Sequence, residues 1–249
     1  MNGKRGARTF DADQTARTID IYGESRLGLA RGFTAVAGGV YTSGKRRQEQ
    51  TFQTAVTGSA SFEEFSPRFG LLWDASERMQ LFANLSRSHE LPGFIELAQV
   101  AAFVPLEAQH AWTGEIGARG SIGDVQLDVS FYRAKVRREL LQFNVSTDIP
   151  TSTINAGKTL HQGIEAGLQA PLAAWARLRA TYQFNDFRFN GDRQYGDNRL
   201  PVIPKHLLRT EVRFGPEARA SRQRSSGCRR VRGPITATRS ARAATPCSA

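Results

Sequence analysis

The stretch AWTGEIGARGSIGDVQLDVSFYRAKVRR, residues 111–138, decides the fold. Apolar and polar residues alternate on both sides of a short connection at residues 121–124. In the first arm Trp112, Ile116 and Ala118 share one face, and in the second arm the apolar face holds Val125, Leu127, Val129 and Phe131. Because strand side chains alternate between two faces, this stretch predicts a β-hairpin with one apolar and one polar face.

The length of the arms indicates a bilayer rather than a soluble sandwich. Each arm runs for about ten residues, enough for a tilted strand to cross a membrane, whereas strands of soluble proteins average about five or six. If Gly120 pairs with Val125, Trp112 lies opposite Arg133, at the end of the apolar band where interfacial aromatic residues gather. The hairpin alone is compatible with two interpretations. One is a membrane barrel with its apolar face toward lipid, and the other is a soluble β-sheet protein.

The same alternation recurs along the chain and predicts nine strands. Besides the two arms of the hairpin, the other seven are residues 17–27, 32–43, 65–74, 79–88, 157–170, 175–188 and 206–214. Short connectors at 28–31, 75–78, 121–124 and 171–174 alternate with long segments at 44–64, 89–110, 145–156 and 189–205. Within the second long segment, residues 95–102 are expected to form a helical turn or two.

This alternation of connections favours an all-β fold, a partial antiparallel up-and-down transmembrane β-barrel. Successive connections of such a barrel fall on opposite rims, which gives short periplasmic turns and long extracellular loops. Trp73 and Trp175 adjoin short connectors and Trp112 adjoins a long one, so the three tryptophans would occupy both aromatic girdles.

Composition bounds the remaining possibilities. The 249 residues carry a net charge of +11 and are 40% hydrophobic. The longest apolar run is too short for a transmembrane helix. Residues 2–13 contain no apolar core of a signal peptide, so none is expected, and a membrane barrel without one suggests an incomplete piece of a longer protein.

The basic charge is concentrated in residues 215–249, which contain eight arginines and one glutamate for a net of +7. This leaves +4 for residues 1–214. The segment is expected to be a disordered basic tail, with two interpretations. Phosphate contacts could bind nucleic acid or anionic lipid, or the loss of pattern could reflect a shifted reading frame. Aromatic residues do not interleave with its arginines, so base stacking is not expected.

Candidate catalytic and metal sites are weak, and we expect no catalytic residue, no metal and no cofactor. Cys228 and Cys247 have no zinc-site or CxxC spacing. Glu63 and Glu64 are adjacent in sequence and are expected in a loop. The four histidines have no HExxH context, and those that fall in a loop are expected to be solvated. They are His89, His110, His161 and His206.

Five segments resemble the barrel strands of TonB-dependent outer-membrane receptors, in the expected order. They begin with SPRFGLLWDASERMQLFANLSRSHELPGFIELA at residues 66–98, and the other four are AWTGEIGARG from Ala111, INAGKTLHQGIEAGLQ from Ile154, NDFRFNGDRQYGDNRLP from Asn185 and IPKHLLRTEVRF from Ile203. The resemblance covers about residues 17–214, which gives a domain division of 1–16 as a leading segment, 17–214 as barrel and 215–249 as tail. FANLSRS and GDNRLP are most similar to the branch that takes ferric citrate or ferric siderophores.

The resemblance implies a non-enzymatic receptor of the cell outer membrane that imports a ferric-siderophore-like complex with energy from the TonB complex. Ligand contacts would come from the extracellular loops at 89–110, 145–156 and 189–205. A plug domain and a terminal aromatic strand of the family are not matched in this sequence, so transport by this polypeptide alone is not expected. The alternatives are a soluble β-rich binding protein and a nucleic-acid binder acting through the basic tail, although no nucleic-acid partner is expected.

The outward face of the second hairpin arm changes character toward the long-loop rim. Arg133, Lys135 and Arg137 continue the face of Val129 and Phe131. Charge on a lipid-facing strand is tolerated mainly at the interface, so these residues could contact lipopolysaccharide phosphates in the outer leaflet. An ordinary solvated extension of the strand is the other interpretation.

Overall fold

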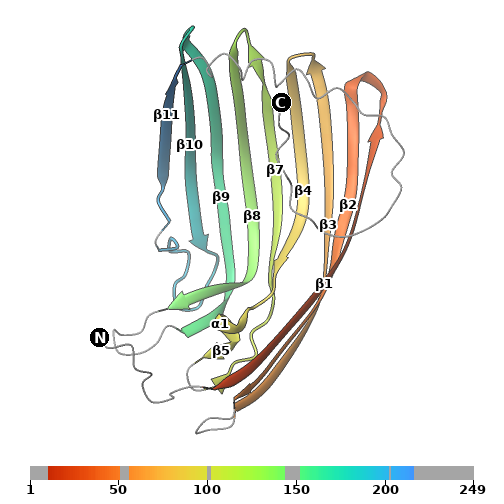
Figure 1. The fold of residues 1–249 in the computed structure, drawn as a ribbon, viewed down its shortest axis with the longest axis vertical. Coiled ribbons are helices and arrows are strands. Elements are labelled where there is room, and N and C mark those ends of the chain that lie inside the picture. The colour runs from red at the N-terminus through yellow and green to blue at the C-terminus, as the bar shows by residue number, and fades with distance from the viewer. Residues whose placement is uncertain (1–10, 51–55, 100–101, 144–151, 202, 216–249) are drawn as a thin grey trace.

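One curved sheet of nine antiparallel strands dominates the computed structural model (Figure 1), which describes residues 11–50, 56–99, 102–143, 152–201 and 203–215. The strands follow one another in chain order across the sheet, so each pairs with its sequence neighbours. They are β1 (Ala12–Gly28), β2 (Phe33–Gln50), β3 (Val56–Ser76), β4 (Met79–Glu90), β7 (Gln109–Ile122), β8 (Val125–Phe143), β9 (Ser152–Ala173), β10 (Ala176–Phe189) and β11 (His206–Phe214). The nine predicted strands and their up-and-down order are confirmed.

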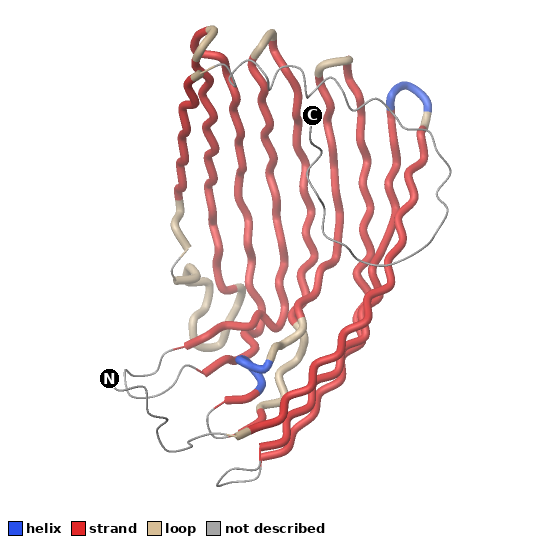
Figure 2. Tube along the Cα trace, viewed as in Figure 1, coloured by secondary structure: helices blue, strands red, loops and turns tan. Residues whose placement is uncertain are grey.

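Short elements occupy the connections. A 3-10 turn, η1 (Ala30–Gly32), joins β1 to β2, and one helical turn, α1 (Phe94–Leu97), precedes the small hairpin of β5 (Ala98–Gln99) and β6 (Ala102–Phe103). The expected helix at 95–102 is therefore confined to its first turn, because residues 98–99 and 102–103 pair with each other instead. Strand covers nearly all of the described chain (Figure 2). Among these residues, no helix is long and apolar enough to cross a membrane.

The two rims differ as predicted. Figure 1 shows tight connections at the upper rim, between β1 and β2, β3 and β4, β7 and β8, and β9 and β10, and the long connections from β4 to β7 and from β10 to β11 at the lower rim. The long segment predicted between β2 and β3 is short, because β2 ends at Gln50 and β3 begins at Val56. β1 and β11 form the two edges of the sheet, which does not close on itself.

The turn of the central hairpin is tighter than predicted, and the predicted register is wrong. Ile122 pairs with Val125, so only Gly123 and Asp124 form the turn, and Trp112 lies opposite Lys135 instead of Arg133. Gly123 has a φ of 59°. A two-residue hairpin turn with a positive φ at its first central position favours glycine there, which is why the turn forms at this residue.

Several strands also extend beyond the predicted boundaries. β1 begins at Ala12 rather than Arg17, and residues 44–64, expected to be largely a loop, belong mostly to β2 and β3. Lys45 pairs with Ser61 and Arg47 with Ser59. Residues 44–50 of β2 are all polar or glycine, so alternation in hydropathy does not mark this extension as a strand. Residues 145–151 and 216–249, with Cys228 and Cys247, lie outside the described residues.

Register assigns the two faces of the sheet. Ile116 pairs with Ala83 of β4 and Phe131 of β8, and Phe131 pairs with Ile164 of β9. The outward face therefore carries one continuous apolar band across the strands, including Phe69, Leu71, Trp73, Leu81, Leu85, Ile116, Leu127, Val129, Phe131, Ile164, Leu208, Val212 and Phe214, all exposed. No second layer covers this band within the described ranges. An uncovered apolar sheet face favours the transmembrane barrel over the soluble alternative.

Aromatic pairs mark the level of the short-turn rim. Trp73 stacks on Phe33 with ring centroids 5.4 Å apart, and Trp175 stacks on Phe214 at 5.8 Å. Both pairs are outward-facing neighbours of tight turns. Aromatic rings at one level are typical of a membrane interface.

Candidate functional site: the long-loop rim and the inner face

The connection at residues 89–110 is anchored beneath β2 and β3 by two glycines. A Cβ on Gly58 would lie 2.1 Å from Cγ of Phe103, and one on Gly44 would lie 2.5 Å from Cδ1 of Leu91. The loop side chains therefore pack directly on strand backbone where a side chain is missing. Leu97, in α1, is fully buried at 0% exposure. The first predicted ligand-facing loop is thus packed against the wall of the sheet.

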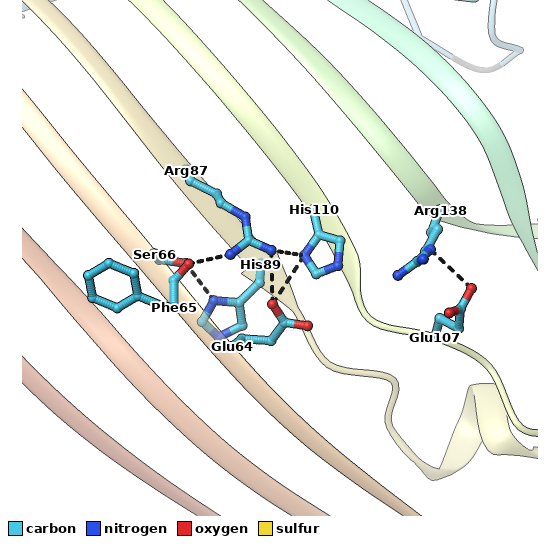
Figure 3. Close-up of polar contacts among 8 residues, drawn as sticks. All are labelled: Glu64, Phe65, Ser66, Arg87, His89, Glu107, His110 and Arg138. Carbon is cyan, nitrogen blue, oxygen red and sulfur yellow. Dashed lines mark hydrogen bonds and ion pairs between the residues drawn. The ribbon is translucent and has the colours of Figure 1, made fainter.

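A polar cluster lies where β3 diverges from β4 near this loop (Figure 3). Arg87 of β4 donates to Oε2 of Glu64 at 3.1 Å and to Nδ1 of His110 at 3.0 Å, and Arg87 also donates to the carbonyl of Phe65. Oγ of Ser66 lies 2.6 Å from Nδ1 of His89. These side chains are expected to hold β3, β4 and β7 together at the rim.

His110 has a cation and a carboxylate beside the same ring nitrogen. Nδ1 of His110 lies 3.0 Å from the guanidinium of Arg87 and 3.3 Å from Oε2 of Glu64. A guanidinium only donates hydrogen bonds, so a bond from Arg87 requires an unprotonated Nδ1. Burial lowers the pKa of His110 below its ordinary value and Arg87 acts in the same direction, against the opposing effect of Glu64. Burial and Arg87 therefore favour the neutral ring, in which Nδ1 can accept from Arg87.

Two sequence predictions are wrong at this place. His89 and His110 were expected to be solvated loop residues, and Glu64 was expected in a loop. Instead the histidines pair across β4 and β7, and the side chains of Glu64 and His110 are only 13% and 15% exposed. The strands continue past the membrane band, so residues that follow the apolar pattern still belong to the sheet.

The structure joins the first predicted loop to the end of the second. Asn155 of β9 accepts from the backbone N–H of Glu107 at 2.9 Å and donates to the carbonyls of Glu107 at 3.0 Å and Arg138 at 2.9 Å. Nε of Arg138 lies 3.0 Å from Oε2 of Glu107 (Figure 3). Arg138 has a φ of 57°, which is uncommon for a residue other than glycine, and these contacts hold β8 at that point.

The third predicted loop packs on the same strand. Phe189 and Leu200 are buried against Ala156 of β9, with Leu141 and Tyr195 around them. The backbone N–H of Asn190 donates to the carbonyl of Lys158 at 3.0 Å. The described parts of loop 89–110 and of loop 189–205 therefore both contact the start of β9. These first residues of β9 belong to the predicted loop 145–156.

A second carboxylate–histidine pair lies beside this junction. Nε2 of His161 is 3.3 Å from Oε1 of Glu139, and Thr159 also donates to that carboxylate. Burial raises the pKa of Glu139, but the hydrogen bonds from His161 and Thr159 outweigh it, so the pKa is lower than usual. His161 stacks on Phe187 at 4.2 Å. The fourth histidine, His206, lies on β11 against Tyr182.

Replacing Asn155 with alanine is expected to lower the free energy of unfolding by about 1–2 kcal/mol. The change removes three hydrogen bonds at a partly solvated position, where each is worth about 0.5 kcal/mol, the low end of the net range. Hydrogen exchange should become faster at Glu107, whose amide loses its acceptor. Asn84→Ala is the matched control, because Asn84 makes one long bond of 3.3 Å to Glu115. Equal acceleration at Glu107 in both variants would contradict the role of Asn155.

The inner face of the sheet differs from the outer face in its charge. A groove of about 440 Å³ on β8 to β11 is lined by both acids and bases, among them Asp128, Glu165, Arg179, Arg209 and Glu211. Arg119 donates two bonds to Oε1 of Gln80, at 2.9 and 2.6 Å. Among the described residues, no group of three or more His, Cys, Asp or Glu side chains could hold a metal ion.

These features together define the wall of a transmembrane β-barrel: an apolar outer face, a polar inner face, tight turns on one rim and packed long loops on the other. The family model for the TonB dependent receptor-like β-barrel matches residues 2–234, and the chain belongs to that family. The match extends beyond the expected resemblance at both ends, because that resemblance covers about residues 17–214.

Solved receptors share this fold. The ferric yersiniabactin uptake receptor FyuA from Yersinia pestis is 16% identical, with a TM-score of 0.65 over 81% of this chain and 32% of that one. The copper transporter OprC is 18% identical, with a TM-score of 0.68 over 82% and 32%, and the unliganded ferric citrate transporter FecA is 18% identical, with a TM-score of 0.66 over 82% and 31%. The chain spans about a third of the length of these proteins.

Proposed function

We propose that this chain is part of an outer-membrane receptor for uptake of a ferric-siderophore or similar iron complex. The observation that carries the proposal is the convergence of loops 89–110 and 189–205 on the start of β9, at the rim opposite the tight turns. Loops held on a rigid scaffold are the usual place for binding residues, and a preformed rim reduces the ordering cost of binding. Family membership and the named functions of FyuA and FecA support an iron complex as cargo.

The charged inner face supports the remaining partners of the proposal. In a complete barrel of this family a plug domain would lie against the polar inner wall, and the TonB complex would act on that plug from the side of the tight turns. Charges of both signs, such as Glu165 and Arg179, offer a surface that a polar domain could pair with. Transport then needs the plug and the remaining wall, and we expect this chain alone to be transport-incompetent.

Uptake of radiolabelled iron tests the proposal in a strain that lacks other iron receptors and carries this segment within its full receptor. Ferric citrate and one ferric catecholate are supplied separately, with a Cu²⁺ arm because OprC is a copper transporter. Deleting residues 190–199 should abolish accumulation of the iron complex, whereas Val129→Ile, on the outward face, should leave it unchanged. Accumulation of Cu²⁺ and neither iron complex would overturn the iron proposal.

A further inference from the structure

Four cations form a row on the outward face at the long-loop end of β8 and β9. Arg133, Lys135 and Arg137 alternate with Ala134 and Val136, which are 9% and 3% exposed on the inward side. Lys158 of β9 pairs with Arg137 and is exposed as well. The three β8 side chains span about 13 Å along the strand at about 3.3 Å per residue. The outer cation row is defined as Arg133, Lys135, Arg137 and Lys158.

The row lies at the level of the membrane interface. Trp112, 43% exposed, lies directly opposite Lys135. On one side of this level the outward face is apolar, through Phe131, Val129 and Leu127 of the same strand. Tryptophan is enriched where the acyl chains meet the headgroups, so the row is placed beside headgroups of the leaflet on the long-loop side.

The charges of the row are not neutralised within the part of the chain that the structure describes. None of the four side chains makes a hydrogen bond or ion pair there, in contrast to the side chain of Arg138, whose Nε lies 3.0 Å from Oε2 of Glu107. Glu139, the next acid along β8, is engaged by His161 and Thr159. Like charges opposite one another on a sheet are destabilising, so the Arg137–Lys158 pair favours an anion supplied from outside.

We propose that the outer cation row binds the phosphate groups of lipopolysaccharide in the outer leaflet. Arginine and lysine form charge-assisted hydrogen bonds with phosphate, and the row offers several such donors in a line at headgroup level. The apolar band next to it, on the side of the tight turns, would receive the acyl chains of the same lipid. The inference rests on the fold and not on the identity of the transported ligand, so the iron-uptake experiment does not bear on it.

Direct binding tests the proposal with the full chain refolded in dodecyl maltoside micelles. Fluorescently labelled bisphosphorylated lipopolysaccharide is titrated against the wild-type chain and against the triple variant Arg133→Gln, Lys135→Gln, Arg137→Gln. We expect the triple variant to raise Kd at least tenfold. Lipopolysaccharide with its phosphates removed should bind the wild-type chain no better than the intact lipid binds the triple variant.

A matched control removes three charges from the inner face instead, in the variant Arg119→Gln, Arg179→Gln, Arg209→Gln. This variant has the same net charge as the triple variant of the outer cation row, and its Kd should stay within twofold of the wild-type Kd. An exchanged variant, Arg133→Lys, Lys135→Arg, Arg137→Lys, should also stay within twofold, which separates lost charge from a folding defect. Equal weakening by the inner-face variant, or full competition by inorganic phosphate at the same phosphate concentration, would overturn a lipid site.

Discussion

Replacing Val129 with arginine is expected to lower the free energy of unfolding in a bilayer by about 2–4 kcal/mol, the cost of an arginine at the midplane on the lipid face of a barrel. Val129 lies midway between the tight turn at Gly123 and the level of Lys135 and Trp112. Its side chain is 48% exposed on the outward apolar band. Urea unfolding of the chain in phospholipid vesicles, followed by tryptophan fluorescence, measures the change.

Ser130→Arg is the matched control for this prediction. Ser130 is the next residue along β8, faces inward and pairs with Glu165 of β9. An arginine there meets water and a carboxylate, so its cost should be within about 0.5 kcal/mol, as for a surface substitution. If the two arginines cost the same, the outward band does not face lipid and the assignment of faces is wrong.

The face assignment is also the part of the fold that the sequence predicts best. Alternation in residues 111–138 is a local signal with a period of two, and each strand carries it independently. Register is less certain from sequence, because it depends on which two residues form the turn. Here the positive φ at Gly123 shortens the turn by two residues and moves Trp112 from Arg133 to Lys135.

The rim could be predicted only in outline. Its position follows from the alternation of short and long connections, but its contacts join residues far apart in sequence. Asn155 bonds with Glu107, and Phe103 packs on Gly58. The glycines carry a usable signal: Gly44 and Gly58 interrupt polar strand segments, and glycine inside a strand often marks the close approach of another segment. Nothing local marks which loop residue fills the space.

The largest packing effect on the inner face is expected at Gly163 of β9. A Cβ there would lie 2.2 Å from the carbonyl oxygen of Phe184 and 2.6 Å from Oη of Tyr132. That hydroxyl donates to Oδ1 of Asn185 at 3.0 Å, and Asn185 in turn donates to the carbonyls of Pro204 at 3.1 Å and Lys205 at 2.9 Å. The missing side chain lets Tyr132 cross β9 and tie β8 to β10 and the start of β11.

Gly163→Val is therefore expected to lower the free energy of unfolding by about 2–4 kcal/mol. Overpacking costs about 1–3 kcal/mol, and the displaced tyrosine loses a hydrogen bond worth about 1 kcal/mol. Urea unfolding in vesicles gives the energy, and hydrogen exchange at Asn185 should show the loss of the tie to the third loop.

Gly114→Val is the control, because no atom lies within 4 Å of a Cβ at Gly114 on the outward face. Valine is favoured in strands, so this change should be neutral or slightly stabilising.

In the Gly163→Val background, Tyr132→Ala should lower the free energy of unfolding by less than it does alone, because the valine already displaces the ring. Removing the tyrosine ring relieves only part of the strain of the valine, because the valine also clashes with the backbone carbonyl of Phe184. Equal costs of Tyr132→Ala in both backgrounds would show that Gly163 does not make room for the tyrosine, and the inner-face tie would then need another cause.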